Sequence, residues 1–334
     1  MACGIDNSVY PMELREFKAF RSMIHERTGI WLRDGKQVML ASRLSRRLRY
    51  YGMAGFAEYY QYVQSVSDDS DEMRELINCV TTNKTSFFRE RHHFEYLASN
   101  VVPEMRAATS HCGPKSIRVW SAVCSTGEEP YTIAITLMEA LQAEWTAASG
   151  ARLKGSAGNG DHSPQHGQGR KGLRGFSLAP GSWKIEVVAS DVDTRVLDTA
   201  RKAIYNEASL AGVDAPLRKK YFLCGKGDML GRVKVKAEVA QLVEFKRVNL
   251  KDACWPLDGL FDTIFFRNAL IYFNHDTQDV FLRKMVRFLK PRGYLFLGNA
   301  EHIPWLHNIL EPLNRTMYRL REREMMIPLS KLQS

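Results

Sequence analysis

The chain has 334 residues, of which 45% are hydrophobic and 25% are charged. This composition is ordinary for a packed globular protein and excludes wholesale disorder, and the length suggests about two domains. The mean hydropathy is −0.31, and no stretch of about 18 uncharged apolar residues occurs, so we expect no membrane span. Residues 1–10 have neither a basic start nor an apolar run. We therefore expect no secretion signal and a cytoplasmic location.

The net charge is +10 and the isoelectric point is about 9.3, which favours an anionic partner such as nucleic acid, an acidic protein or a membrane surface. The six cysteines occur singly, and none forms a C-x-x-C pair, so neither a zinc knuckle nor a dithiol motif is predicted. The adjacent His92 and His93 would point about 100° apart on a helix and could not share a metal ion. We therefore expect no metal.

Residues 1–82 are predicted to form a helical domain. Apolar residues recur at three- and four-residue spacing before Gly29, which predicts one amphipathic helix: they are Leu14, Phe17, Phe20 and Ile24. A second helix is predicted over 35–51, with Val38, Leu40, Leu44 and Leu48 inward and a basic face of Arg43, Arg46, Arg47 and Arg49 largely outward. Two short helices follow at 56–66 and 73–80, and residues 83–114 form a linker and a connecting helix.

Strands alternate with helices after Pro114, so residues 115–325 are predicted to form an α/β domain around a doubly wound, mainly parallel sheet. The expected strands are 117–121, 184–190, 261–266 and 294–297, and the expected helices are 130–145, 194–203 and 277–289. Ligands of such sheets bind beyond the carboxyl ends of the strands.

Two segments interrupt this alternation. Residues 146–182 are rich in Gly, Ser and Ala with almost no large apolar side chain, which predicts a disordered insertion in a surface loop. Residues 221–247 instead alternate between apolar and polar side chains, with glycines between the runs. This pattern predicts a small antiparallel β-subdomain.

Two turns carry candidate binding residues. Glu128 and Glu129 open a helix after the first strand; acid at that position disfavours a phosphate and favours ammonium or hydroxyl groups. The alternative is plain helix capping. Asp191, at the end of the second strand, suits the hydroxyls of a ribose. Its alternative is an N-cap, a role that Asp193 could serve as well.

Four segments occur in an order that is far more specific than any one of them: Thr81–Glu90 (TTNKTSFFRE), Ser125–Tyr131 (STGEEPY), Ala189–Asp193 (ASDVD) and Arg267–Phe273 (RNALIYF). Together they resemble the CheR-type chemotaxis receptor methyltransferases. The resemblance runs from the N-terminal helices to about Tyr318, excluding the insertion. It implies an N-terminal all-helical domain, a class I methyltransferase domain that uses S-adenosylmethionine, and a small antiparallel β-subdomain within it.

The resemblance also implies roles at matching positions. The linker residues Asn83, Thr85 and Arg89 would close over the cofactor, with Arg89 suited to its carboxylate. The remaining cofactor contacts would be Glu129 to the ammonium, Asp191 to the ribose, Asn249 and Leu250 to the adenine, and Arg267 and Asn268 to the methionine end. Arg267 and Tyr272 are the candidate catalytic residues that would hold the acceptor. The alternatives are a salt-bridged arginine and a core aromatic. The chain departs from the family by reading Asn299-Ala300-Glu301 where His-Ser-Glu is usual, and by its long insertion.

The implied reaction is methyl transfer from S-adenosylmethionine to glutamate γ-carboxylates on receptor signalling helices, which leaves S-adenosylhomocysteine. A glutamate with a pKa of about 4.3 is already anionic at neutral pH, so no general base is required. The expected partners are methyl-accepting chemotaxis receptors, which would recruit a cytoplasmic, monomeric enzyme to membrane arrays. The basic helix could dock the acidic receptor helices. The loop at Gly225 and Gly227 resembles that of family members that tether a C-terminal receptor peptide.

Two other functions remain possible from the sequence. One is a nucleic-acid methyltransferase, suggested by the basic isoelectric point, although the fourth segment lacks the Pro-Pro-aromatic motif common in amine methylation of bases. The other is a non-catalytic module that senses S-adenosylmethionine or docks on a receptor.

Overall fold

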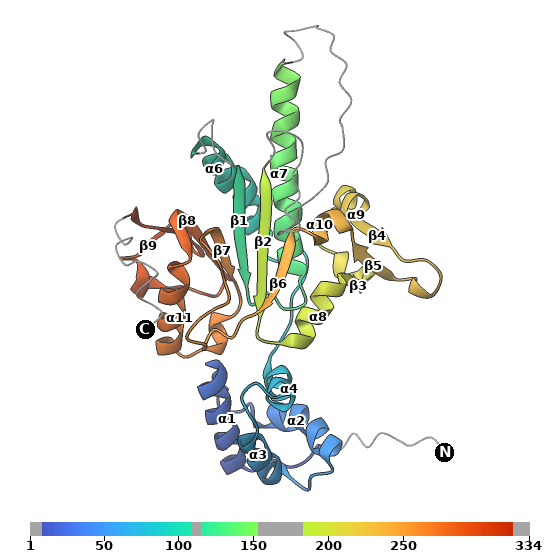
Figure 1. Cartoon of the computed structure of the whole chain (residues 1–334), viewed down its shortest axis with the longest axis vertical. Helices are drawn as coiled ribbons and strands as arrows, with labels where there is room; N and C mark the ends of the chain where they lie inside the picture. The colour runs from blue at the N-terminus through green and yellow to red at the C-terminus, as the bar shows by residue number, and fades with distance from the viewer. Residues whose placement is uncertain (1–8, 109–114, 153–182, 323–334) are drawn as a thin grey trace, which may run out of the picture.

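The computed structural model describes residues 9–108, 115–152 and 183–322, with the side chains of 143–152 left out. A small helical domain lies below a larger α/β domain in Figure 1. No helix in the described ranges is long and apolar enough to cross a membrane.

The helical domain packs four helices, α1 (Leu14–Thr28), α2 (Gln37–Tyr51), α3 (Phe56–Ser65) and α4 (Asp71–Val80). Phe17, Phe20 and Ile24 are buried as the α1 spacing predicted, and α1 ends at Gly29 in the left-handed conformation. The predicted inward position of Val38 is wrong, because its side chain is 76% exposed. Val38 lies two residues before Leu40, about 200° around the helix from the buried face.

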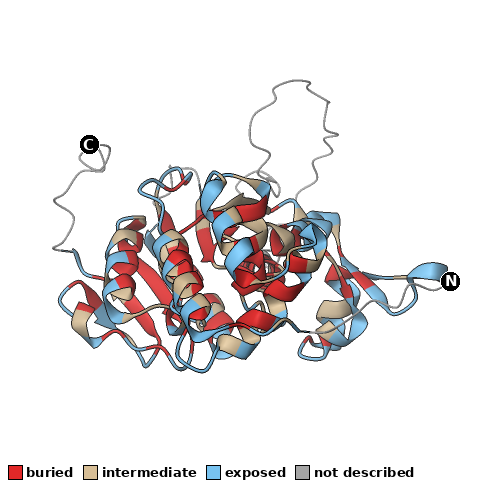
Figure 2. Ribbon diagram, turned by 90° about the horizontal axis from the view of Figure 1, so that it is seen from below, coloured by how far each residue is buried: buried red, intermediate tan, exposed pale blue. Residues whose placement is uncertain are grey.

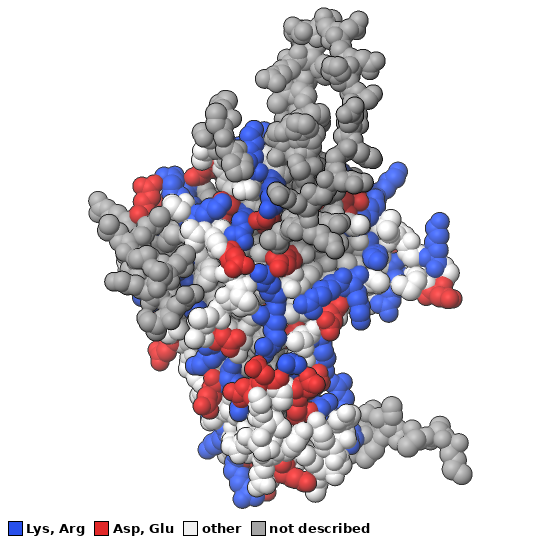
Figure 3. Space-filling model, viewed as in Figure 1, with Lys and Arg blue, Asp and Glu red and all other residues white. Residues whose placement is uncertain are grey.

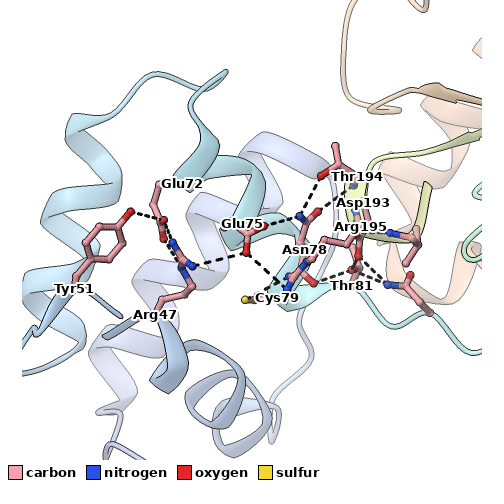
Figure 4. Close-up of polar contacts among 12 residues, drawn as sticks. Arg47, Tyr51, Glu72, Glu75, Asn78, Cys79, Thr81, Asp193, Thr194 and Arg195 are labelled. Atoms are coloured by element: carbon pink, nitrogen blue, oxygen red, sulfur yellow. Dashed lines mark hydrogen bonds and ion pairs between the residues drawn. The ribbon is translucent and has the colours of Figure 1, made fainter. Parts of the chain in front are cut away.

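The prediction that the α2 arginines point largely outward is wrong for Arg43 and Arg47. Arg43 donates to the backbone oxygens of residues 79–81, which are the free carbonyls at the end of α4. Arg47 pairs with the buried Glu72, to which Tyr51 also donates a hydrogen bond (Figure 4). A single-helix pattern does not reveal that α4 packs over this face.

The large domain is built on one sheet in the order β6-β2-β1-β7-β8-β10-β9. Its first five strands run parallel, β10 is antiparallel to β8, and β9 is antiparallel to β10. This confirms the doubly wound α/β fold predicted from the sequence. The bounds are β1 (Ser116–Ala122), β2 (Lys184–Asp191), β6 (Val243–Arg247), β7 (Phe261–Phe266), β8 (Leu289–Leu297), β9 (Leu310–Pro312) and β10 (Met317–Leu320).

Strand β8 is longer than predicted, because it includes the Pro-Arg-Gly segment 291–293, which lies between the predicted helix 277–289 and the predicted strand 294–297. Arg292 takes a positive φ of 58°, and the pairing of β7 with β8 shifts register near Phe261. An irregularity of this kind lets a strand pass through residues that usually end one. The predicted helix 277–289 accordingly ends earlier, as α11 (His275–Val286).

Helices cover both faces of the sheet, and the buried residues lie between the layers (Figure 2). One face packs against α5 (His92–Tyr96), the π-helical turn Leu97–Val101, α6 (Val102–Ala108) and α7, and the other face packs against α11. Helix α7 (Glu128–Arg152) continues past Trp145, so the start of the predicted insertion is helical. Residues 153–182 of that segment lie outside the described residues. The far end of α7 lies opposite the helical domain (Figure 1).

The predicted extent of the β-subdomain, 221–247, is wrong at both ends. The small sheet has the order β3-β5-β4, with β3 (Ile204–Asn206), β4 (Phe222–Cys224) and β5 (Arg232–Val235). Residues 243–247 form β6, which pairs in parallel with β2 in the main sheet. Alternation predicted a half-exposed strand correctly, but it could not say which sheet the strand joins. The connecting helices are α8 (Thr194–Lys202), α9 (Ala215–Tyr221) and α10 (Ala237–Ala240).

The two domains are joined by side-chain contacts at the first turn of α8 (Figure 4). Asp193 accepts hydrogen bonds through one oxygen from Thr81 (2.7 Å) and Asn83 (2.8 Å). Its other oxygen accepts from the backbone N–H of Arg195 and Val196, so Asp193 is also the N-cap of α8. One carboxylate therefore fixes the end of the helical domain against the start of a helix of the α/β domain.

We predict that Arg47→Ala lowers the free energy of unfolding by about 3 kcal/mol, because it leaves the buried Glu72 carboxylate without its cation. Urea unfolding followed by circular dichroism measures the loss. Arg46→Ala is the matched control on the exposed side of the same helix and should change stability by no more than about 0.5 kcal/mol. Equal stability of the two variants would contradict a structural role for Arg47.

Candidate active site

The candidate residues come together at the carboxyl edge of the parallel strands, which faces the helical domain (Figure 1). Glu129 lies in the first turn of α7 after β1, Asp191 ends β2, and Arg267 follows β7. The linker segment 83–90 adds a fourth element that arrives from the helical domain. Ligands of doubly wound sheets bind at this edge.

The β1–α7 turn is held against the end of β2. Ser125, with a φ of 51°, donates its backbone N–H to Asp191 Oδ2 at 2.9 Å. Gly127 has a φ of 95°, and a Cβ there would lie 2.7 Å from the Cβ of Ala200. Only glycine fits both the conformation and the space, so this position sets where α7 begins.

Asp191 is buried, and each of its carboxylate oxygens accepts one backbone N–H, from Ser125 and from Asp193 (3.0 Å). Burial raises the pKa of Asp191 to about 6, against the lowering effect of these hydrogen bonds. A carboxylate oxygen can accept more than one hydrogen bond. Asp191 therefore retains acceptor capacity for hydroxyl groups of a ligand.

Arg267 lies between two carboxylates. Its Nη1 is 2.9 Å from Glu129 Oε2, and its Nη2 is 3.0 Å from Glu90 Oε2; its side chain is 2% exposed. Burial raises the pKa of Glu129 although Arg267 opposes it. Burial also acts on Glu90, but Arg267 and Asn268 outweigh it and lower the pKa of that carboxyl. With all three groups ionised, the cluster carries one excess negative charge.

The turn after β7 depends on Asn268 and Glu301. Asn268, with a φ of 58°, donates its side-chain amide to Glu90 Oε1 at 3.1 Å. Glu301 accepts the backbone N–H groups of Asn268, Leu270 and Gly298. A Cβ at Gly298 would lie 2.4 Å from Asn268 Nδ2, so the two segments approach as closely as a glycine allows.

Two of the three linker residues expected to close over a cofactor, Asn83 and Arg89, make hydrogen bonds within the protein. Asn83 bonds Asp193, Thr85 is half-buried, and Arg89 donates to the carbonyl oxygen of Lys84 at 2.8 Å. These contacts keep the linker beside α8. Contacts of these three residues with the cofactor are a proposal.

Asn249 and Leu250 follow β6. Among the described contacts, they share no hydrogen bond with Glu129 or Arg267. The Asn249 amide donates to the carbonyl of Arg27 at 2.7 Å, and Leu250 is buried in the core beside α11. Tyr272 accepts the backbone N–H of Trp31 through its carbonyl at 2.7 Å. Its side chain is half-buried, and its hydroxyl makes no hydrogen bond within the part of the chain that the structure describes.

Three residues of the site were not predicted from the sequence. Glu90 immediately follows Arg89 in the first diagnostic segment, Ser121 Oγ donates to Glu129 Oε1 at 2.7 Å from the end of β1, and Glu301 supports the turn at Asn268. Glu90 could have been found from its place in the linker, and Ser121 from its place near the end of the first strand. Glu301 was visible only as the retained member of a segment that otherwise departs from the family.

The site fits the cofactor that the resemblance implies. Glu90 and Glu129 both pair with Arg267, whose Nε is buried without a partner among the described residues. Asp191 is a further buried carboxylate at the same edge of the sheet. S-adenosylmethionine carries an ammonium, a sulfonium and ribose hydroxyls, all of which suit carboxylate acceptors. No group of three or more His, Cys, Asp or Glu side chains within the described ranges is arranged to hold a metal ion.

Comparison with known proteins agrees over nearly the whole chain. Residues 83–150 and 176–319 match the family "CheR methyltransferase, SAM binding domain", and residues 15–81 match "CheR methyltransferase, all-alpha domain". The chain is 38% identical to the chemotaxis protein methyltransferase of Salmonella typhimurium, over 91% of this chain and 89% of that protein. It is 36% identical to chemotaxis protein methyltransferase 2 of Pseudomonas aeruginosa, over 93% and 95%. It is 37% identical to the Escherichia coli protein, over 91% and 90%.

Proposed function

This chain belongs to the CheR methyltransferase family, and from that premise we propose that it methylates glutamate side chains on chemotaxis receptors. Membership of this family supports S-adenosylmethionine-dependent methylation in chemotaxis. The glutamate acceptor, the site residues and the receptor contacts are the parts that we propose. The product would be a glutamyl methyl ester together with S-adenosylhomocysteine.

The observation that carries the proposal is the buried, carboxylate-rich cluster at the carboxyl edge of the sheet. Its excess negative charge would be costly in a dry interior without a cation. The cofactor, with two positive groups and one carboxylate, brings one net positive charge. Glu129 suits its ammonium and Asp191 suits its ribose hydroxyls.

The protein mainly has to align the acceptor carboxylate with the methyl group of the cofactor. When bound, S-adenosylmethionine supplies a methyl group already activated by the sulfonium. An acceptor glutamate is anionic at neutral pH, so the site needs no general base. Arg267 is held by Glu90 and Glu129, which supports the salt-bridged role over direct contact with the acceptor. Tyr272, with its hydroxyl unbonded in the described structure, is the better candidate to contact the acceptor carboxylate.

Transfer of labelled methyl groups from S-adenosylmethionine to receptor-containing membranes tests the function. We expect label in receptor protein that is released as methanol by mild base, because carboxyl esters hydrolyse and methylated amines do not. Base-stable label, or label in nucleic acid, would contradict the glutamate assignment. Cofactor binding without any transfer would favour a non-catalytic module.

A basic cleft supports receptor docking, and three of the four arginines expected from the sequence line it. The cleft has a volume of about 650 Å³ between α2, the end of α4 and the start of α8. Arg43, Arg46 and Arg49 line it together with Arg195, which was not predicted, whereas Arg47 is held by Glu72. Figure 3 shows Lys and Arg side chains gathered where the two domains meet, with acidic groups between them. An acidic helix is the complementary partner.

We predict that Arg46→Glu lowers the initial rate of receptor methylation about 3- to 10-fold at low salt, because it reverses charge on the docking surface. The binding constant for S-adenosylhomocysteine should not change. Raising the ionic strength should reduce the difference between the variant and the wild type. Lys18→Glu makes the same charge change on the exposed face of α1, away from the cleft, and an equal effect there would contradict specific docking.

The small sheet supports the proposed tether in a revised form. Strands β3 and β4 are both edges of that sheet. Leu223 is exposed on β4, and Met229 and Leu230 are exposed on the β4–β5 loop. A Cβ at Gly225 would lie 1.9 Å from the carbonyl oxygen of Met229, so this glycine closes the loop itself. Gly227, with a φ of 57°, allows the following turn. An open edge beside exposed apolar side chains suits strand addition by a peptide.

We predict that peptides from the receptor C-terminus with aromatic-rich ends bind the full chain in a fluorescence-polarisation titration. Leu230→Asp should weaken that binding because it places charge on the exposed apolar tip, whereas Asp228→Asn should not. A tether raises local enzyme concentration, so methylation should be enhanced at low enzyme and not at saturation. Absence of binding at high micromolar peptide would leave the basic cleft as the proposed recruitment surface.

We predict that S-adenosylhomocysteine binds about 10-fold more weakly at pH 5 than at pH 7.5, because Asp191 must be ionised to accept the ribose hydroxyls. The raised pKa of about 6 means that roughly one molecule in ten carries the charge at pH 5. Asp191→Asn should bind more weakly at pH 7.5 and lose most of this dependence. Isothermal calorimetry across the range measures it, and an unchanged slope in the variant would contradict the assignment.

A further inference from the structure

Glu90 contacts both residues that follow β7. Its Oε2 lies 3.0 Å from Arg267 Nη2, and its Oε1 accepts from Asn268 Nδ2 at 3.1 Å. Its side chain is 10% exposed. The neighbouring carbonyl, that of Arg89, also accepts from Arg267. The linker therefore surrounds one end of the guanidinium, while Glu129 holds the other.

We propose that Glu90 is a positioning residue for Arg267: by pairing with one side of the guanidinium, it leaves the negative charge of Glu129 available to the ammonium of the cofactor. This inference rests on the proposed function, because it assumes that the site binds S-adenosylmethionine. In this proposal, the linker carboxylate of Glu90 neutralises Arg267, and the charge of Glu129 remains for the ligand.

The charge balance of the cluster is the first argument. With Glu90 and Glu129 both ionised, Arg267 neutralises one of them and one negative charge remains for a ligand. Without the charge of Glu90, Arg267 and Glu129 would form a neutral pair. An ammonium would then have to displace Arg267 from Glu129 and leave a buried guanidinium unpaired, which is costly.

The surroundings of Glu90 are the second argument. His93 Nδ1 lies 3.5 Å from Glu90 Oε2, but burial, with Arg267 and His92, lowers the pKa of His93 to about 3, so this ring is neutral at physiological pH. Among the described contacts, Arg267 is thus the cation that Glu90 faces. Glu90 also takes a φ of 57°, which a side chain rarely adopts without support from its neighbours.

The test compares two ligands on Glu90→Gln. S-adenosylhomocysteine has the ammonium, and its desamino analogue keeps the carboxylate and adenosine but lacks it. We expect Glu90→Gln to bind S-adenosylhomocysteine at least about 10-fold more weakly than the wild type, as loss of one charge-assisted contact implies. The desamino analogue should bind both proteins within about twofold. Glu90→Asp, which keeps the charge, should recover most of the affinity for S-adenosylhomocysteine.

Glu95→Gln is the matched control, since it removes an exposed carboxylate from α5, five residues further along the chain. Equal weakening of both ligands by Glu90→Gln would mean that Glu90 only supports the fold, and it would overturn the inference. Unchanged binding of S-adenosylhomocysteine would overturn it as well. Failure of the wild type to bind either ligand would instead contradict the proposed function, so the two failures are distinguishable by calorimetry.

Discussion

The ion pairs of one buried arginine hold this site together. Arg267 follows β7, yet its partners come from α7 through Glu129 and from the interdomain linker through Glu90. Three elements far apart in sequence are thereby fixed around a desolvated charge. A buried ion pair of this kind is weak evidence for stability, because desolvation offsets much of the attraction. Its value here is geometric: it sets the position of the carboxylates at the edge of the sheet.

The same linker is held a second time at Asp193. That carboxylate accepts from Thr81 and Asn83 while it caps α8, so residues 81–90 run between two anchored ends. Asn249, bonded to the carbonyl of Arg27, joins the domains at another point. The helical domain is therefore part of the support of the site. Changes that move the helical domain should therefore alter the charge cluster.

The sequence predicted the elements whose burial pattern is local. Strand β7 was predicted with its observed bounds, and β2 nearly so, because continuous apolar runs indicate buried parallel strands. It could not predict partners. Residues 243–247 alternate as an edge strand does in either sheet, and the outward face of α2 became inward where α4 packs over Arg43 and Arg47. Those outcomes depend on which surfaces meet, and a periodicity within one segment carries no information about that.

The site residues, like the secondary-structure elements, were predictable only where their position depends on one local segment. Residues at strand ends were identifiable because a parallel sheet brings those ends together, whereas Glu90 and Glu301 act only through contacts across elements. The local charge of the site and of the cleft could also be found only from the assembled structure. The chain carries a net charge of +10, yet its buried site is negative and its cleft at the domain junction is positive. Under the proposed function this separation is useful, because an anionic receptor helix is attracted to the cleft and repelled by the empty carboxylate cluster. The positive charge of the cofactor removes that repulsion, so the acceptor glutamate meets a favourable site only after the methyl donor is in place.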